Sequence, residues 1–157
     1  SFIDELPSNI EIIKLPREKD DTDLHHAVSE GMSRGFKEFV FFGSFGSRPD
    51  HSMASLYTLY NVLKSHANGK ILGDGFQVQI IENTSLKIYK DPNIYVSIFP
   101  FGGAADGVTL EGFKYPLQNV QLCMSNPIGI SNEIDSNIAT VTVTNGILVI
   151  MIINKNL

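Results

Sequence analysis

Up to residue 69, apolar positions follow helical spacing and strand spacing in turn. Apolar residues recur three or four positions apart in residues 22–34 and again in residues 50–66, which predicts two helices. Strands are predicted over residues 10–15 and 39–42, and the second is apolar on both faces, as in a central strand covered by helices. Strands alternating with helices in this way are typical of a parallel α/β sheet.

After residue 69, short apolar stretches are separated by turn residues. Strands are predicted over residues 76–82, 86–89, 95–99, 107–110, 120–124, 138–144 and 147–153. The dipeptide Asn145-Gly146 between the last two strands is typical of a type I′ hairpin. Many short antiparallel strands predict a β-sandwich, so we expect an α/β domain over residues 1–70 and an all-β sandwich over residues 71–157.

Composition narrows the class of protein. The 157 residues include 12 Lys and Arg against 17 Asp and Glu, a net charge of −5, which argues against nucleic-acid binding and against binding to anionic membranes. A single cysteine, Cys123, excludes a disulfide framework and a Cys-rich zinc site. The longest apolar run, residues 147–153, is far shorter than the roughly 20 residues that span a bilayer. We therefore expect a soluble, reduced, cytoplasmic protein.

The first candidate site is the acidic segment at the start of the first predicted helix. Asp20 and Asp23 are three residues apart, so in a helical turn they would share a face. Mg²⁺ is commonly bound by one or two carboxylates together with phosphate oxygens and water. The alternative interpretation is a helix cap with solvated charges.

The second candidate site is the glycine-rich loop over residues 43–51, between a predicted strand and a helix. Gly43 and Gly46 would allow backbone N–H groups to face an anion at the start of the helix. Arg48 suits phosphate, and Asp50 is a candidate metal ligand. No Gly-Lys-Ser/Thr sequence follows, so the loop is not a Walker A motif. The alternative is an ordinary strand-to-helix turn.

A third candidate is the polar turn over residues 129–133, whose alternative interpretation is a hairpin loop. In this order, the three segments together resemble the motifs of the thiamin pyrophosphokinase family. They stand here as Glu18-Lys19-Asp20-Asp21-Thr22-Asp23, Gly43-Ser44-Phe45-Gly46-Ser47-Arg48-Pro49-Asp50-His51 and Ser131-Asn132-Glu133. Residues 108–117 also resemble the second domain of that family, and the resemblance covers nearly the whole chain. One departure is Ser47, where the family usually has Gly.

The resemblance implies a Rossmann-like domain followed by a β-sandwich. It also implies transfer of a diphosphoryl group from ATP to the hydroxyl of thiamin, with Mg²⁺, in a homodimer whose subunits share the thiamin cleft. By matching positions, the implied catalytic residues are Asp20, Asp23, Arg48 and Asp50, of which the three aspartates would also bind the metal. The implied phosphate-binding residues are Lys19, Thr22, Gly43, Gly46, Arg48 and His51, and the implied thiamin-binding residues are Ser131 and Asn132.

Two alternatives stay open. One is a related diphosphokinase that acts on another hydroxymethyl heterocycle, such as a pterin-type alcohol. The other is a non-catalytic protein that binds a nucleotide or a thiamin derivative. Resemblance at Ser131-Asn132-Glu133 favours thiamin, and the acidic segment with Arg48 favours an enzyme over a binding protein.

The family also has an earlier Gly-Asp-Phe-Asp-Ser motif, whose aspartates bind metal and substrate, and this chain starts about where that motif ends. We therefore expect the native protein to carry further N-terminal parallel strands beside residues 39–42, with at least one more metal-binding aspartate. We expect the 157 residues alone to be poorly soluble and unable to make thiamin diphosphate, because an apolar strand with an open edge favours aggregation.

Overall fold

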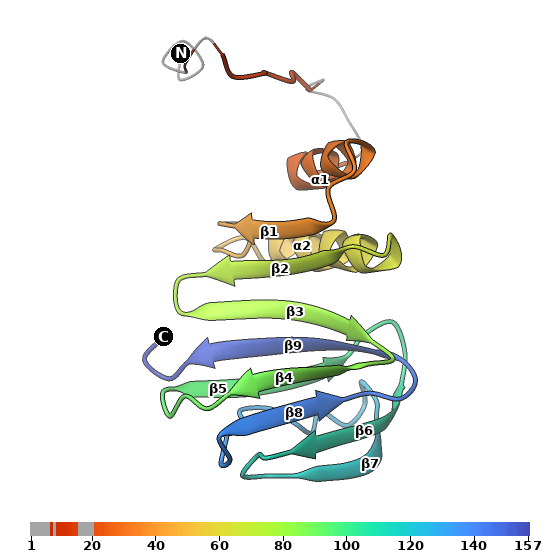
Figure 1. Cartoon of the computed structure of the whole chain (residues 1–157), viewed down its shortest axis with the longest axis vertical. Coiled ribbons are helices and arrows are strands. Elements are labelled where there is room, and N and C mark those ends of the chain that lie inside the picture. The colour runs from red at the N-terminus through yellow and green to blue at the C-terminus, as the bar shows by residue number, and fades with distance from the viewer. Residues whose placement is uncertain (1–6, 8, 16–20) are drawn as a thin grey trace.

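The computed structural model describes residues 7, 9–15 and 21–157, and Figure 1 shows its helices and strands. Its elements are α1 (Asp23–Ser33), β1 (Glu38–Phe42), α2 (Pro49–Lys64), β2 (Asn68–Gly73), β3 (Phe76–Glu82), β4 (Ser85–Tyr89), β5 (Ile94–Pro100), β6 (Ala105–Glu111), β7 (Leu117–Leu122), β8 (Ile138–Thr142) and β9 (Ile147–Asn154). Within the described residues, no helix is both long enough and apolar enough to cross a membrane.

The strands form two sheets. One has five strands in the order β1-β2-β3-β9-β5, in which β1 and β2 are parallel and the other pairs antiparallel. The other has four antiparallel strands in the order β4-β8-β6-β7. The α/β part followed by an antiparallel sandwich is thus confirmed, although the described residues contain only one parallel pair.

β9 is buried on both of its faces and belongs to two hydrophobic cores. Leu148 and Ile150 pack in the core between the two sheets. Val149, on the opposite face, packs in the core beneath α2, which lies behind the five-stranded sheet in Figure 1. Because alternate residues of a strand point to opposite faces, this double burial explains why nearly all of β9 is apolar.

Local signals set the limits of the helices. The Thr22 side chain caps α1 by accepting a hydrogen bond from the His25 backbone N–H at 3.2 Å. Gly35 follows α1 with φ +86° and ends it, as expected. α2 ends earlier than the predicted residue 66, because His66 adopts φ +55°.

Gly69, three residues after the predicted end of the second helix, lies in β2, a strand that the sequence did not predict. A Cβ atom at Gly69 would lie 2.6 Å from Cδ1 of Leu59 and 3.1 Å from Cγ1 of Val62. The glycine therefore allows α2 to pack closely on β2. The predicted domain boundary after residue 70 falls inside this strand, and the division into two domains stays a prediction.

One prediction about the first part of the chain is wrong. Residues 10–15 form no strand, since no other strand of the described residues pairs with them. β1 is the outermost strand of the described sheet, and its Val40 and Phe42 side chains are 44% and 74% exposed there. Whether further strands pair with β1 in the native protein stays a prediction.

The predicted hairpin at Asn145-Gly146 is also wrong. β8 belongs to the four-stranded sheet and β9 to the five-stranded sheet, so these residues connect two sheets instead of two paired strands. Asn145 bridges to Asp106, and Gly146 has φ +114°. A Cβ atom at Gly146 would lie 2.9 Å from the Ala104 carbonyl oxygen, so close packing as well as backbone conformation requires glycine here.

Candidate functional site

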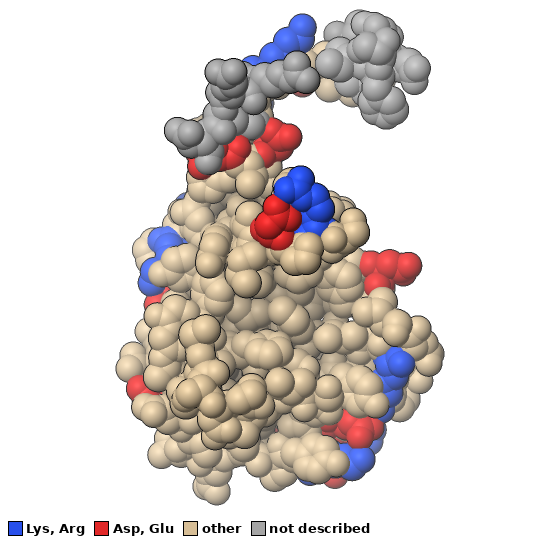
Figure 2. Space-filling view, turned by 180° about the vertical axis from the view of Figure 1, so that it is seen from behind, with Lys and Arg blue, Asp and Glu red and all other residues tan. Residues whose placement is uncertain are grey.

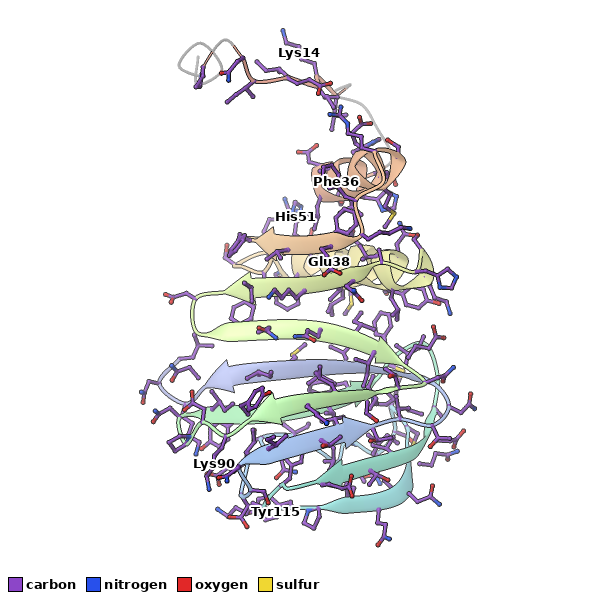
Figure 3. All side chains as sticks on the ribbon, in the orientation of Figure 1. Lys14, Phe36, Glu38, His51, Lys90 and Tyr115 are labelled. Atoms are coloured by element: carbon purple, nitrogen blue, oxygen red, sulfur yellow. The ribbon has the colours of Figure 1, made fainter. Side chains whose placement is uncertain are left out.

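A cavity of about 290 Å³ lies where β1 ends and α2 begins. Five predicted phosphate-site residues line it: Thr22, Gly43, Gly46, Arg48 and His51. The other lining residues are Leu24, Ser44, Ser47, Ala54 and Ser55. Figure 3 shows His51 beside the end of β1. The structure thus brings together the glycine-rich loop and the residue that caps α1, from segments about twenty residues apart in sequence.

Two serines of α2, which the sequence analysis did not single out, hold the loop in shape. The Ser55 hydroxyl lies 2.9 Å from the backbone oxygens of both Ser44 and His51. The Gly46 backbone N–H donates to the Ser52 hydroxyl at 3.3 Å. The spacing of these serines was a signal in the sequence. Hydroxyl side chains three residues apart in the first turns of an amphipathic helix can form hydrogen bonds with the loop that precedes it.

The Ser44 hydroxyl is buried beside this cavity and has no hydrogen-bond partner among the described residues. A buried polar atom without a partner costs free energy. Together with the N–H groups of the first turn of α2, which have no partner within the helix, it makes this cavity suitable for an anion with several acceptor oxygens.

Arg48 and Asp50 form an exposed ion pair at the N-terminus of α2. Nε of Arg48 donates to Oδ1 of Asp50 at 3.2 Å, and Nη2 donates to Oδ2. This pairing lowers the pKa of Asp50 below its ordinary value and raises the pKa of Arg48. Both side chains are about two-thirds exposed, so a phosphate could replace the carboxylate as the partner of Arg48 at little cost.

The structure brings the predicted metal ligands together less closely than it does the predicted phosphate-binding residues. Asp23 lies in the first turn of α1 and lines a separate cavity of about 580 Å³ with Glu11 and His26. Asp20 and Lys19 lie outside the described residues. Among the side chains that are described, no three His, Cys, Asp or Glu converge on one point. Mg²⁺ needs only one or two carboxylates with phosphate oxygens, so Asp23 and Asp50, each in the first turn of a helix, have the chemical character of its ligands, although no described contact joins them.

The predicted thiamin segment follows the outer edge of β5. Val96 and Asn132 exchange backbone hydrogen bonds of 2.9 Å, and the Ile98 N–H donates to the Gly129 carbonyl. Ser131 is exposed and has φ +53°. Asn132 is only 2% exposed, and its side chain binds both the N–H and the carbonyl of Tyr115, at 3.1 and 2.7 Å. This geometry suits Asn132 to holding the segment and Ser131 to contacting a ligand.

The two predicted halves of the site are far apart within one chain. Neighbouring strands are about 4.8 Å apart, so β1 and β5, which are four strand spacings apart, are separated by about 19 Å. In Figure 3, His51 lies near β1, and Tyr115, whose backbone binds the Asn132 side chain, lies near the opposite end of the molecule. Ser131 and Asn132 therefore do not line the cavity of Arg48 and His51.

Comparisons with known proteins match both parts of the chain. The family model described as "Thiamin pyrophosphokinase, catalytic domain" matches residues 3–71, and "Thiamin pyrophosphokinase, vitamin B1 binding domain" matches residues 83–148. The chain is 31% identical over 135 residues to the thiamine pyrophosphokinase of Bacillus subtilis (strain 168), covering 85% of this chain and 63% of that protein.

Solved structures show the same fold. A crystal structure of thiamine pyrophosphokinase from Bacillus subtilis has a TM-score of 0.82 and 30% identity, and covers 87% of this chain and 64% of that one. The thiamin pyrophosphokinase of Geobacillus thermodenitrificans has a TM-score of 0.79 and 26% identity, over 88% and 64% of the two chains. The chain thus spans less than two thirds of the length of these relatives. With both domain models matched in order, this chain belongs to the thiamin pyrophosphokinase family.

Proposed function

We propose that this protein transfers the diphosphoryl group of ATP to the hydroxyl of thiamin, giving thiamin diphosphate and AMP. The observation that carries the proposal is the cavity at the end of β1, where the glycine-rich loop, Arg48 and His51 meet Thr22. Family membership supports thiamin as the acceptor, since residues 83–148 match the vitamin B1 binding domain.

In this reaction the thiamin hydroxyl oxygen forms a bond to the β-phosphorus and loses its proton to solvent, and the bond from that phosphorus to the oxygen that leaves with AMP breaks. Catalysis of phosphoryl transfer depends mainly on positioning and on stabilising charge. The N–H groups of the loop and of the first turn of α2 would bind phosphate oxygens. Arg48 would release Asp50 and pair with the transferred group instead. The released Asp50 carboxylate would lie beside that group, where it would orient the hydroxyl or a metal ion. Mg²⁺, held by Asp20, Asp23 and Asp50, would neutralise phosphate charge.

We also propose that the protein acts as a homodimer. The two halves of the site lie at opposite ends of the five-stranded sheet, so a second subunit would bring a partner's 129–132 segment to the Arg48 cavity. An apolar groove of about 570 Å³ between α2, the end of β5 and the middle of β9 supports this, with Met53, Tyr57 and Met124 exposed along it. Figure 2 shows that much of this side of the molecule is uncharged.

The proposed activity is tested with the natural protein, ATP, thiamin and Mg²⁺. We expect AMP and thiamin diphosphate in equal amounts. A hydroxymethyl pterin in place of thiamin is the matched control and should give no diphosphorylated product. Formation of the pterin product alone, or binding of ATP and thiamin without turnover, would replace the proposal with one of the two alternatives.

The carboxylates at the helix starts are expected to determine the metal requirement. Asp20→Asn and Asp23→Asn should each raise the Mg²⁺ concentration needed for half-maximal rate by about tenfold, because each removes one anionic ligand. Asp21→Asn is the control, since no metal role is proposed for it. If both variants titrate with Mg²⁺ as the parent does, the acidic segment is only a helix cap.

Mixing two inactive variants tests the shared site. Arg48→Ala and Ser131→Trp should each be inactive alone, the second because its bulk would block the thiamin side. After dissociation and reassociation together, about a quarter of the parental activity should return, since half of the random dimers would carry one intact site. If a sample shown to contain mixed dimers recovers no activity, that result contradicts a site built from two subunits.

A further inference from the structure

Glu133 joins three segments that are distant in sequence. Oε1 of Glu133 accepts a hydrogen bond from Nζ of Lys114 at 2.8 Å, in the turn between β6 and β7. Its Oε2 accepts from Nζ of Lys155, which follows β9. Lys114 and Glu133 are also joined through the backbone, because the Lys114 N–H donates to the Glu133 carbonyl at 2.8 Å.

Glu133, Lys114 and Lys155 form a cluster, and further contacts of Lys155 stabilise it. Nζ of Lys155 lies 4.9 Å from the centre of the Tyr95 ring on β5, a cation–π distance. The Lys155 backbone N–H also donates to the Asn93 carbonyl. The two ammonium groups hold the pKa of Glu133 at about 2, well below its ordinary value. The carboxylate is therefore ionised at neutral pH, and each of its oxygens accepts a hydrogen bond from one ammonium group.

This cluster adjoins the exposed segment that carries Ser131. Ser131 has a left-handed backbone conformation, which is unfavourable for a non-glycine residue and persists only when surrounding contacts hold it. Beside it, the segment forms one wall of a cavity of about 360 Å³, with Tyr115 on the other side. Asn132 and Glu133 both bind the 114–115 turn, so both fix the width of that cavity.

We propose that Glu133, through Lys114 and Lys155, is a positioning residue that fixes the 127–132 segment for thiamin binding. The substrate part of this inference rests on the proposed function. In this role Glu133 acts through the two lysines, each of which donates to one of its carboxylate oxygens. It acts by keeping Ser131 and the walls of the neighbouring cavity in one arrangement.

Glu133→Gln and Lys155→Met test the anchoring, with Glu82→Gln as the control. Glu82 also accepts from a lysine, Lys64, at 2.8 Å, and its exposure of 30% matches the 32% of Glu133, but it lies on β3. Hydrogen exchange at the backbone amides of Val96 and Asn132 should become about three- to tenfold faster in both test variants and stay unchanged in the control. Unchanged exchange in both test variants would overturn the anchoring role.

Kinetics test the positioning role. Both variants should raise KM for thiamin about three- to tenfold and leave kcat and KM for ATP within about twofold, as expected for lost ground-state positioning. Lys114→Arg should retain the parental KM, because the arginine can still pair with Glu133, whereas Lys114→Met should not. Faster exchange with an unchanged KM for thiamin, or an equal fall in kcat, would overturn the positioning role. If the parent makes no thiamin diphosphate, the proposed function fails, and the exchange measurement still decides the anchoring.

Discussion

Arg48→Ala is expected to lower turnover by about 10²–10³-fold, because the developing charge on the transferred phosphate would lose a donor aimed at it. Arg48 lies at the end of the glycine-rich loop and lines the cavity at the start of α2. The only ion pair described for Arg48 is with Asp50, at the N-terminus of the same helix. The variant should therefore fold normally, since exposed ion pairs contribute only about 0–1 kcal/mol to stability.

The control is Arg34→Ala. Arg34 also forms exposed ion pairs, with Glu11 and Glu30, but it lies at the end of α1 and does not line the Arg48 cavity. We expect this variant to keep near-parental turnover. Rates are measured at saturating ATP and thiamin, and circular dichroism checks that both variants are folded. Near-normal turnover in Arg48→Ala would show that the guanidinium does not act on phosphate.

Leu148→Ala and Leu59→Ala are each expected to lower the free energy of unfolding by about 2–5 kcal/mol, the range for removing a buried leucine side chain. Leu148 is fully buried between the two sheets, and Leu59, on α2, is buried in the core between that helix and the five-stranded sheet. Because β9 contributes alternate residues to both cores, we expect one unfolding transition, which both substitutions shift.

Ile138→Ala is the control, since Ile138 is 44% exposed on β8 and should change stability by less than about 1 kcal/mol. Unfolding in urea is followed by circular dichroism and by tyrosine fluorescence. Two separate transitions, each moved by only one of the leucine substitutions, would mean that β9 does not couple the cores. They would also support the predicted division into independent units at residue 70.

The sequence by itself determined the elements whose signals are local. Helix α1 begins at the Thr22 cap and ends before Gly35, and β3 has the predicted limits, because caps and alternating patterns act within a few residues. The grouping of Thr22 with the glycine-rich loop was also predictable in part, since parallel strands and helix starts meet at one edge of a sheet.

Only the tertiary structure decided which sheet each apolar strand joins. Residues 138–144 and 147–153 are consecutive predicted strands, yet β8 lies in the four-stranded sheet and β9 lies between β3 and β5 in the five-stranded sheet. It also decided that Gly69 lies in a strand, because α2 packs against the space that a side chain would fill. Neighbours distant in sequence set both outcomes, so no short window of residues contains them.

The same distinction applies to the site. The loop of Arg48 is shaped by residues within a dozen positions, such as Ser52 and Ser55, so its chemistry was visible as a motif. The positions of Asn132 and Glu133 depend on partners 17 to 22 residues away in Tyr115, Lys114 and Lys155. A motif shows which side chains are present, whereas hydrogen bonds between distant segments decide whether each one contacts a ligand or holds the fold, and only the folded chain brings those partners within reach.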